Sequence, residues 1–592
     1  MKKLGAALIL GLCSSIPGIA ADKSDPEQAD PRNWPAVGRS ANDTHYSPLI
    51  EINRDTVSRL RLAWTLDIDA TSVQSTPLAV DGVVYVAAGY SIVHAVDGRT
   101  GKQLWRYDPE VVKFAGRKLR AGAGIRGLAY SKGRLYVGTH DGRLLALDAK
   151  KGTLVWGIEA LRGQDGSFIS GPPRVFGDNL AIGFGDTGMV RGAVDVYAAA
   201  DGRFLWRWDT EGGGGTVWNA ITYDAGLGLL FVGTGNARGD APNPQACSVI
   251  ALNAMSGKQV WQYDESREDK SNCDSSTDIT LATLDIDGQP RKVILHAPRD
   301  GSFHVIDRQS GQGISRAKLG EGSHNHFAQS FHPQTGWVYL PTTDVPAPIT
   351  ADTPADAGRS FLLAWDPARQ RAQWAIPTPG AYSGGVLSTA GDLVFQGQSD
   401  GYLVGYSASQ GRKAWAFFAG APPLAAPISY GVGNKQYIAV LAGPPSGMPA
   451  SVGAMAAQFG WDSRVHPRRL LAFTLDGEAS LPPTPKPNAA QPVDVPEFAL
   501  NEGLVREGAI VYERCQWCHG LGAAAGGAAP DLRASPVPLN PAAFAAAVRN
   551  GNEPRGMPKF EELKDSELDA LRHYLRARAR TAVHPSAQPS QP

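Results

Sequence analysis

The chain has 592 residues, too many for one ordinary hydrophobic core, so we expect several domains or a large assembly of repeats. Its 68 glycines and 43 prolines exceed their usual share, which favours many short strands joined by tight turns. Lysine plus arginine equals aspartate plus glutamate at 57 each, so charge gives no case for a nucleic-acid partner.

Residues 1–21 are typical of an export signal. A lysine pair precedes the apolar run LGAALILGL, and small residues that suit cleavage follow at Gly18, Ala20 and Ala21. Leu12 is large where a lipidated Cys13 would need a small neighbour, so a lipid anchor is not expected. The apolar run is too short to span a bilayer, and no later run is long enough. We therefore expect a soluble periplasmic protein without a membrane span.

A repeated unit follows, in which a β-run leads to a Gly-containing turn and then to a tryptophan. It recurs as AVDGRTGKQLW (95–105), ALDAKKGTLVW (146–156), VYAAADGRFLW (196–206) and ALNAMSGKQVW (251–261), with weaker copies at 305–315, 364–374 and 405–415. Trp64 supplies one more position without the turn, and Ser315 replaces one tryptophan. Successive positions lie 41 to 59 residues apart, which suits a four-stranded sheet with its loops.

These eight units predict an all-β, eight-bladed β-propeller over residues 22–476, in which each tryptophan docks one blade on the next. Insertions lengthen units two to six, and they predict that a site is built from loops on one face.

A linker and a second domain follow the propeller. Residues 477–500 are Pro-rich and lack apolar periodicity, which predicts a semi-rigid linker. Residues 501–580 are Ala-rich with helical periodicity and predict a small all-α domain. Ser566 and Asp569 suggest a capping box for its last helix. The polar tail 581–592 is expected to be disordered.

CQWCH (515–519) is the most specific motif of the chain. Cys515 and Cys518 can form thioethers to both vinyl groups of one haem, and His519 can ligate its iron. A zinc or redox CxxC is the alternative, but no second CxxC follows. Met557, in the loop RGMPKF, is the expected sixth ligand, because it is the only methionine of the domain and a thioether suits electron transfer. The motif predicts a cytochrome c domain carrying haem c.

The stretch EGGGGTVWNAITYDAGLGLLFVGTGN (211–236) is the other chemistry-bearing segment. Its glycines let the backbone approach a flat group, and Trp218 offers a face for stacking. Asn236 can offer an amide oxygen to a hard cation. Taken alone, the stretch is also compatible with a Gly-rich hairpin around a core tryptophan.

Together with the haem motif, this stretch resembles the quinohaemoprotein alcohol dehydrogenases, propeller enzymes that bind pyrroloquinoline quinone (PQQ) and calcium. The resemblance covers nearly the whole mature chain. It includes NWPAVGRSANDTHYSPL (33–49), PRKVILHAPRDG (290–301) and GGVLSTAGDLVFQGQSDGYLVGY (384–406), besides GTGN and the C-terminal cytochrome.

The resemblance implies a role for each matching residue. Trp218 would stack on PQQ, Thr216 would bond its edge, and Arg126 would meet one of its carboxylates. Arg299 would bond the reactive quinone oxygens. Asp274 would be the general base and would touch the metal, with Asn236 as a further calcium ligand.

The chain also departs from the family pattern. RAGAGIRG (120–127) replaces a pair of adjacent cysteines over PQQ. GFGDTGMVRG (183–192) lacks the calcium-ligating glutamate, so Asp186 is the best substitute. Gln74 replaces a glutamate that contacts PQQ. Ser276 stands where lanthanide-using relatives have a second aspartate, which favours calcium.

Two further features stay open at this point. Cys247 and Cys273 form either a disulfide, as an oxidising compartment favours, or two buried thiols. Cys273 replaces a tryptophan that precedes the base in the family. SHNHF (323–327) with His332 resembles a metal cluster, but a loop between strands is the favoured interpretation because zinc would lack a fourth ligand.

We expect a periplasmic quinohaemoprotein dehydrogenase that oxidises a small-molecule or polymeric alcohol. Asp274 would take the hydroxyl proton as hydride leaves for the quinone, which calcium and Arg299 polarise. Electrons would pass through haem c to an external acceptor such as a cytochrome c or a copper protein. One alternative is hydroxylation next to nitrogen, as in the lupanine hydroxylase type, and secondary alcohols are another substrate class. A non-enzymatic propeller scaffold is disfavoured by the co-occurrence of the site residues and the haem motif.

Overall fold

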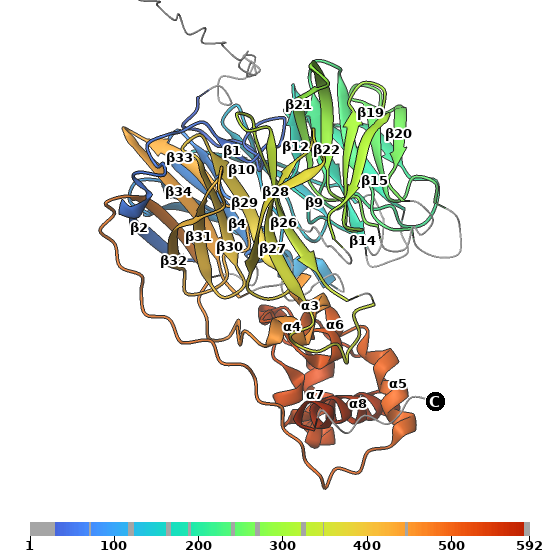
Figure 1. The fold of residues 1–592 in the computed structure, drawn as a ribbon. Helices are drawn as coiled ribbons and strands as arrows, with labels where there is room; N and C mark the ends of the chain where they lie inside the picture. Colours follow the sequence, from blue (N-terminus) through green and yellow to red (C-terminus); the bar gives the residue numbers. More distant parts are fainter. Residues whose placement is uncertain are drawn as a thin grey trace, which may run out of the picture.

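The structure is a computed structural model that describes residues 30–69, 73–116, 124–161, 167–186, 191–237, 243–266, 273–320, 327–346, 348–444 and 448–584. These residues form a ring of β-sheets with a group of helices beside one of its faces (Figure 1). Within these ranges, no helix has the length and apolar character needed to cross a membrane.

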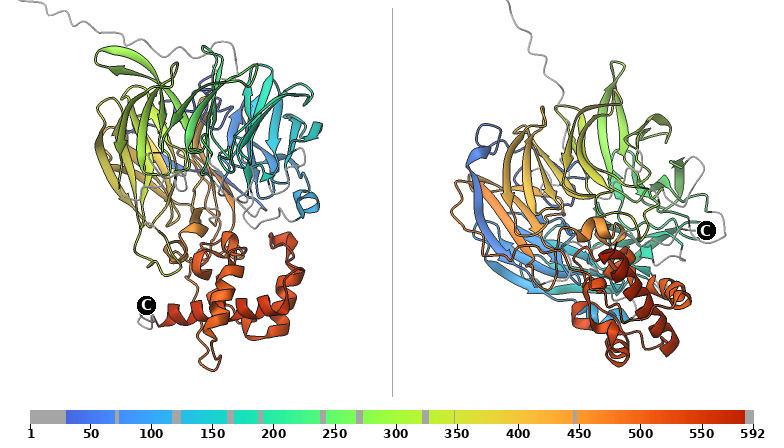
Figure 2. Two further views of the ribbon diagram at one scale, coloured as in Figure 1. Left: turned by 90° about the vertical axis from the view of Figure 1, so that its right-hand side faces the viewer. Right: turned by 60° about the horizontal axis from the view of Figure 1, so that its bottom comes forward.

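Eight four-stranded antiparallel blades make up the ring, so the predicted eight-bladed propeller is confirmed (Figures 1 and 2). The first four blades consist of β3 (Leu78–Val80), β4 (Val83–Ala88), β5 (Ile92–Asp97) and β6 (Gln103–Tyr107); β7 (Ala129–Ser131), β8 (Arg134–Gly138), β9 (Arg143–Asp148) and β10 (Leu154–Glu159); β12 (Arg174–Phe176), β13 (Asn179–Gly183), β15 (Ala193–Ala198) and β16 (Phe204–Asp209); and β17 (Ile221–Asp224), β18 (Leu229–Gly233), β19 (Ser248–Asn253) and β20 (Gln259–Asp264).

The remaining blades consist of β21 (Ile279–Ile286), β22 (Gln289–His296), β23 (Ser302–Asp307) and β24 (Gly313–Lys318); β25 (Ser330–His332), β26 (Trp337–Asp344), β27 (Arg359–Asp366) and β28 (Arg371–Thr378); β29 (Ser383–Thr389), β30 (Leu393–Gln398), β31 (Tyr402–Ser407) and β32 (Lys413–Phe418); and β33 (Ile428–Val432), β34 (Lys435–Ala442), β35 (Arg469–Leu475) and β2 (Leu60–Asp67). A two-stranded sheet of β11 (Ser167–Phe168) and β14 (Gly185–Asp186) is inserted in the third blade. The fourth strands β6 and β10 carry many exposed residues, whereas β3 and β29 are wholly buried, so the first strand of a blade is innermost.

The last blade joins the two ends of the propeller sequence. Its outer strand β2 pairs antiparallel with β35, and Leu60 stands opposite Leu475. This pairing explains why Trp64 has no preceding turn, because its strand follows β35 in space and not in sequence. The largest apolar cluster accordingly combines residues of the first, second, seventh and eighth blades.

The repeated tryptophans dock neighbouring blades, as predicted. Six of them donate Nε1–H to a main-chain carbonyl of the next blade over 2.9 to 3.2 Å: Trp64, Trp105, Trp156, Trp206, Trp374 and Trp415. The turn glycine is required for this packing. Gly152 has a φ of 69°, and a Cβ there would lie 2.5 Å from the Trp105 ring. The Nε1 of Trp261 is buried and has no hydrogen-bond partner among the described residues.

The segment 32–47 contacts the first strand of every blade. It bonds to β33 through the Arg32 carbonyl and the Gly431 N–H, to β3 through Trp34 and Ala79, and to β7 through the Pro35 carbonyl. Asp43 pairs with Arg174 of β12 and accepts from Thr222 of β17 over 3.0 Å. The carbonyls of Asn42 and Thr44 accept from β21 and β25, and β1 (Tyr46–Ser47) pairs parallel with β29. This N-terminal segment therefore lies along the inner edge of the whole ring.

The C-terminal region is a small helical domain, as predicted. It contains α5 (Glu502–Tyr512), α6 (Gln516–His519), α7 (Pro541–Asn550), α8 (Asp565–Val583) and the 3₁₀ turns η3 (Leu521–Ala523), η4 (Leu532–Ala534), η5 (Val537–Leu539) and η6 (Glu553–Arg555). The predicted capping box is wrong, because α8 begins before Ser566. Glu567 supplies the cap and accepts from the Lys564 N–H over 2.9 Å.

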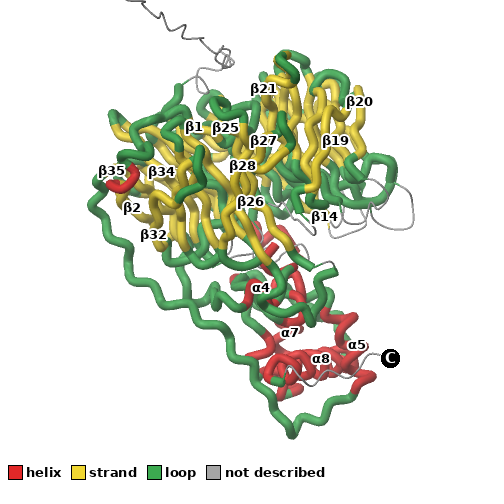
Figure 3. The backbone as a smooth tube through the Cα atoms, in the orientation of Figure 1, coloured by secondary structure: helices red, strands yellow, loops and turns green. Residues whose placement is uncertain are grey.

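An extended linker and several direct contacts join the helical domain to the propeller. Between β35 and α5 the chain has no helix or strand, and Figure 3 shows it as one continuous loop. Arg469 fixes its start by donating to the Pro482 carbonyl over 3.0 Å, and Arg580 fixes its end through Asp494 at the same distance. The loop after α3 (Met448–Ser451) and α4 (Ala454–Ala457) also touches the helical domain, since Ser463 donates to the carbonyls of residues 527 and 528. The remaining short helices, η1 (Val57–Arg59) and α2 (Val111–Ala115), lie in propeller loops.

Candidate active site and haem cavity

The glycine-rich loop is held tightly against its neighbours. Gly214 and Gly215 have φ values of 74° and 66°, which glycine adopts without strain. A Cβ on Gly215 would lie 2.8 Å from the Asn243 amide nitrogen, and that amide donates to the Gly212 and Gly213 carbonyls over 3.2 and 3.0 Å. The close approach predicted from these glycines is thus made to neighbouring protein segments, and it fixes the loop that leads to Trp218.

The Trp218 backbone is clamped from two sides. The buried Ser276 hydroxyl accepts from the Trp218 N–H over 3.0 Å and from the Asn219 N–H over 3.2 Å. Ser170 donates to the Trp218 carbonyl over 3.1 Å. A Cβ on Gly185 would lie 3.4 Å from Trp218 Cβ, so the β14 strand also packs on this residue. The indole therefore has a fixed position.

The Asp274 carboxylate lies beside that indole. Trp218 Nε1–H donates to both of its oxygens, over 3.1 and 3.3 Å, and the Ser276 N–H donates to Oδ1 over 3.2 Å. Asn236 Oδ1 accepts from the Cys273 N–H over 2.9 Å and from the Asp274 N–H over 2.7 Å. A Cβ on the intervening Gly235 would lie 3.0 Å from Thr216 Oγ1 and 3.5 Å from Asp274 Oδ1. Thr216, Trp218, Asn236 and Asp274 thus lie close together, and their roles stay predictions.

One arginine brings positive charge to the site, and a second adjoins Asp274 through its backbone. The guanidinium of Arg126 lies over the Trp218 ring, with Cζ 4.5 Å from the ring centroid. Burial lowers the pKa of Arg126 to about 10, against the opposing charges of Asp278 and Asp274, so it stays positive at neutral pH. Arg299 adjoins Asp274 through its backbone, whose N–H donates to the Cys273 carbonyl over 3.1 Å and to the Asp274 carbonyl over 3.3 Å.

The structure adds three residues that sequence reasoning missed. The Asp278 carboxylate accepts from the Asn219 amide over 2.7 Å, and His45 Nε2 lies 3.6 Å from its other oxygen. Burial raises the pKa of Asp278, but His45, Asn219 and the charge of Arg126 outweigh it, and the net pKa is lowered. A second carboxylate therefore lies charged near Arg126. Its position four residues after Asp274 gave no periodic signal, and His45 comes from the N-terminal segment.

Several other predicted positions lie partly or wholly outside the described residues, or have few described contacts. Asp186 ends β14, paired with Ser167, and its side chain lies outside the described atoms. Gln74 is half-buried. Residues 120–123 of RAGAGIRG and 323–326 of SHNHF fall outside the described ranges. His332 is buried, with Nε2 3.1 Å from the Thr389 carbonyl.

The two open cysteines form a disulfide. Cys247 and Cys273 are bridged, with their Cα atoms 5.6 Å apart, and both are buried. The thiol alternative is therefore wrong. The bridge stands immediately before Asp274 in the chain.

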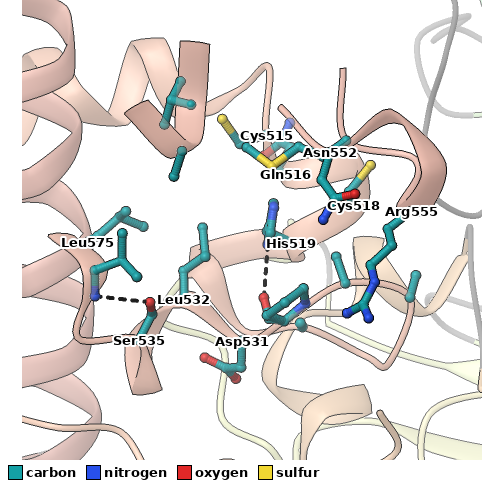
Figure 4. A pocket seen from close by; sticks show the side chains of 18 of the residues that line it. Cys515, Gln516, Cys518, His519, Asp531, Leu532, Ser535, Asn552, Arg555 and Leu575 are labelled. Atoms are coloured by element: carbon teal, nitrogen blue, oxygen red, sulfur yellow. Dashed lines mark hydrogen bonds between the residues drawn. The ribbon is translucent and has the colours of Figure 1, made fainter. Parts of the chain in front are cut away.

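A cavity of about 1010 Å³ lies between the helical domain and the loop that follows α4. Trp461 and Asp462 of that loop line it. Its helical side contains every predicted haem residue: Cys515, Cys518, His519 and Met557. Figure 4 shows the two cysteines and His519 around this space. His519 Nδ1 lies 2.8 Å from the Pro530 carbonyl, and burial lowers the pKa of this histidine. Nδ1 is therefore the protonated nitrogen, which leaves Nε2 as a ligand atom.

Comparison with known proteins identifies both parts of the chain, the propeller and the helical domain. The family model described as "Glucose/ethanol/alcohol dehydrogenase, beta-propeller domain" matches residues 34–319, and that of "Cytochrome C oxidase, cbb3-type, subunit III" matches residues 503–575. A quinohaemoprotein alcohol dehydrogenase, ADH IIB of Pseudomonas putida, is 34% identical over 98% of this chain and 98% of its own. The chain belongs to the quinohaemoprotein alcohol dehydrogenase family.

Other members of the family agree with the fold. The solved structure of the quinohaemoprotein alcohol dehydrogenase ADHIIG from Pseudomonas putida HK5 matches with a TM-score of 0.85 at 30% identity, over 95% of this chain and 97% of that one. The lupanine 17-hydroxylase of a Pseudomonas species is 29% identical over 98% of this chain and 96% of its own. Quinohaemoprotein alcohol dehydrogenases are PQQ-dependent oxidoreductases with haem c, and calcium is typical of them.

The residues of this chain fit haem c and PQQ better than they fit calcium. One cavity holds a CxxCH motif with an oriented histidine and a methionine, which fits haem c. A fixed indole beside Arg126 suits a flat anionic cofactor such as PQQ. Calcium prefers six to eight oxygen ligands, but Asn236 Oδ1 already accepts two N–H groups. Among the described residues no group of three or more His, Cys, Asp or Glu could hold a metal. Ligation of calcium by Asn236, Asp274 and Asp186 stays a prediction.

Proposed function

We propose that Asp274 is the general base of an alcohol oxidation in this enzyme. The bonds from Trp218 Nε1–H to both Asp274 oxygens carry the proposal, because they place a carboxylate at the edge of the proposed stacking surface. A carboxylate that accepts N–H bonds keeps its charge and can take the proton of a substrate hydroxyl. Trp218, Thr216, Arg126 and Arg299 would hold PQQ around this base.

PQQ, when bound, supplies a quinone carbon that accepts hydride from the carbon bearing the hydroxyl group. Asp274 takes the hydroxyl proton on a carboxylate oxygen, and the indole N–H stabilises that carboxylate between turnovers. The positive charges of Arg126 and Arg299 bind the anionic groups of the cofactor. The fixed position of Trp218, which Ser276 and Ser170 hold, orients the stacked ring toward the base.

The helical domain would carry electrons away from the propeller. Haem c, when bound, accepts electrons one at a time. Cys515 and Cys518 would attach it covalently, and His519 Nε2 and Met557 Sδ would bind its iron. The cavity borders both the propeller and the helical domain, so the haem would lie between the oxidation site and an external acceptor such as a cytochrome c or a copper protein. The N-terminal signal motivates a periplasmic location.

A hydroxylase is the second candidate function, supported by the similarity to lupanine 17-hydroxylase. In that reaction hydride leaves a carbon beside nitrogen, and water then adds to that carbon. The stronger similarity to alcohol dehydrogenases favours alcohol oxidation. Haem reduction by primary, secondary and polymeric alcohols, measured beside reduction by cyclic tertiary amines, separates the two functions. Reduction by amines alone would overturn the alcohol dehydrogenase proposal.

Asp274→Asn tests the base directly, because the amide keeps an oxygen but cannot accept the proton. A positioned base contributes about 10²–10⁴-fold, so substrate-driven haem reduction should fall by at least about 100-fold while PQQ content stays at the parental level. Asp285→Asn removes the same charge from the exposed far end of β21 and is the matched control. Near-parental reduction by Asp274→Asn would show that another group is the base.

A further inference from the structure

Asp274 has an unusual backbone conformation. Its φ is 23°, in the region that residues with a side chain rarely adopt. Such a conformation is strained and persists only where the surroundings hold it in place. The source of that restraint is therefore visible in the contacts of the residues around Asp274.

The first restraint is covalent. Cys273, the preceding residue, is bonded to Cys247, and both are buried. Cys247 is itself anchored, since its N–H donates to the Gly235 carbonyl over 3.0 Å and its carbonyl accepts from the Glu265 N–H over 3.0 Å. The disulfide thus ties the backbone just before the base to the start of β19 in the neighbouring blade.

The second restraint is a pair of hydrogen bonds to one atom. Asn236 Oδ1 accepts from the Cys273 N–H over 2.9 Å and from the Asp274 N–H over 2.7 Å. An amide oxygen has two lone pairs, so these donors use its full capacity. Asn236 therefore holds the same two residues that the disulfide holds.

We propose that Asn236 and the Cys247–Cys273 disulfide are positioning residues that set Asp274 in its reactive orientation before any metal binds. The family resemblance implies that Asn236 binds calcium. We assign it another role here, in which its side-chain oxygen fixes the backbone of Asp274. The proposal rests on the proposed role of Asp274 as base. Misplacement of a reacting group by about 1 Å can cost on the order of 100-fold in rate, so a loosened loop should show in turnover.

The disulfide is tested with the double variant Cys247→Ser/Cys273→Ser of the full chain, reconstituted with PQQ. Loss of an orienting contact typically costs about 10–100-fold, so kcat should fall by that factor while PQQ content is retained and KM changes little. Trp206→Phe weakens a blade contact elsewhere and is the stability control. Both proteins are assayed well below their unfolding temperatures. An unchanged kcat in the double variant would overturn the role of the disulfide.

Asn236→Ala tests the second restraint with a readout that is independent of turnover. Calcium bound per chain is measured by titration calorimetry on the PQQ-free protein. The positioning role predicts a loss of kcat with the same calcium binding as the parent, and no recovery in excess calcium. Weakened calcium binding together with recovery of kcat in excess calcium would show that Asn236 acts as a metal ligand and would overturn the proposal.

A triple variant that combines Asn236→Ala with Cys247→Ser and Cys273→Ser shows whether the hydrogen bonds and the disulfide position the same residues. Because Asn236 and the disulfide hold the same two residues, the triple variant should lose less than the product of the separate losses. A fully multiplicative loss would contradict a shared target. If Asp274→Asn abolishes turnover and the positioning variants do not, only this inference fails. If Asp274→Asn is active, the proposed function fails first.

Discussion

The guanidinium of Arg126 lies over the indole ring of Trp218, with Cζ 4.5 Å from the ring centroid. The surface proposed for stacking of PQQ is thus accompanied by a fixed positive charge. A planar cation on an aromatic ring is a favourable contact by itself, and the same cation can bond a carboxylate in bidentate fashion. Trp218 and Arg126 together therefore suit a group that is both flat and anionic, as proposed for PQQ.

Arg126→Gln should weaken PQQ binding. A hydrogen bond to a charged group contributes about 1.5–3 kcal/mol, so the dissociation constant should rise on the order of 10–100-fold. Equilibrium dialysis of PQQ against the parent and the variant measures the change. Arg572→Gln, which removes a similar contact between α8 and Phe498 of the linker, should bind PQQ like the parent.

Met557→Ala should lower the haem reduction potential and shift the visible spectrum. Thioether ligation raises the potential of a His-ligated haem, and Met557 lines the haem cavity. The haem should nevertheless remain on the polypeptide in denaturing electrophoresis, since Cys515 and Cys518 hold it. Met255→Ala alters a methionine that is 74% exposed on the propeller and should change neither property. An unaltered potential in Met557→Ala would exclude this residue as ligand.

Two tryptophans of the repeat should respond differently to replacement by phenylalanine. Trp206→Phe removes an Nε1–H bond of 3.1 Å and leaves the Ala254 carbonyl without that donor. Trp261→Phe removes a buried N–H that has no partner among the described residues. Trp206→Phe should therefore be less stable by about 0.5–1.5 kcal/mol than Trp261→Phe. Denaturant unfolding of the two variants measures the difference, and equal stabilities would contradict it.

Glu265 and His296 form a buried ion pair, with Oε1 and Nδ1 2.7 Å apart. Burial raises the pKa of Glu265, but the charges of His296 and His304 outweigh it and the pKa is lowered. Burial lowers the pKa of His296, but Glu265 outweighs it and the pKa is raised. The stabilisation of the fold by charged His296 is complete below the unfolded pKa of about 6.5. It is lost as the pH rises through the pKa of the folded state. The stabilisation by charged Glu265 is complete above about 4.3 and is lost at lower pH.

The pair should therefore stabilise the fold most between about pH 4.3 and 6.5. Glu265→Gln should cost about 3–5 kcal/mol there, because it leaves a buried charge without its partner. Thermal unfolding between pH 4 and 9 should show a smaller gap between parent and variant as the pH rises above this window. A constant gap over the whole range would contradict the assigned charges.

The local signals of the sequence predicted the fold well. The turn glycine and tryptophan of each repeat, such as Gly152 and Trp105, lie within a few residues of the strands that they define, and CQWCH is continuous. The position of Trp64 in the last blade could not be predicted, since it depends on pairing between β2 and β35. Strand pairing over such a separation leaves no periodic trace in the sequence.

The candidate site was predicted by residue type more than by role. Ser276 was interpreted through metal preference, whereas its hydroxyl accepts the backbone N–H groups of Trp218 and Asn219. Asp278 was missed because its partner His45 comes from the N-terminal segment, far from it in the sequence. Contacts of this kind arise only when the ring has closed, and a single sequence does not encode them as a pattern.

The N-terminal segment 32–47 has a consequence for how the molecule is assembled. Its partners include β33 in the last blade, and β2 needs β35 to complete its sheet. The first strand of the propeller therefore cannot be stabilised until almost the whole domain has been synthesised, and contacts of such high sequence separation slow folding. Closure of the ring requires residues from both ends of the propeller sequence. Because the segment 32–47 contacts the first strand of every blade, we expect its deletion to remove support from all eight blades together and to make their unfolding less cooperative.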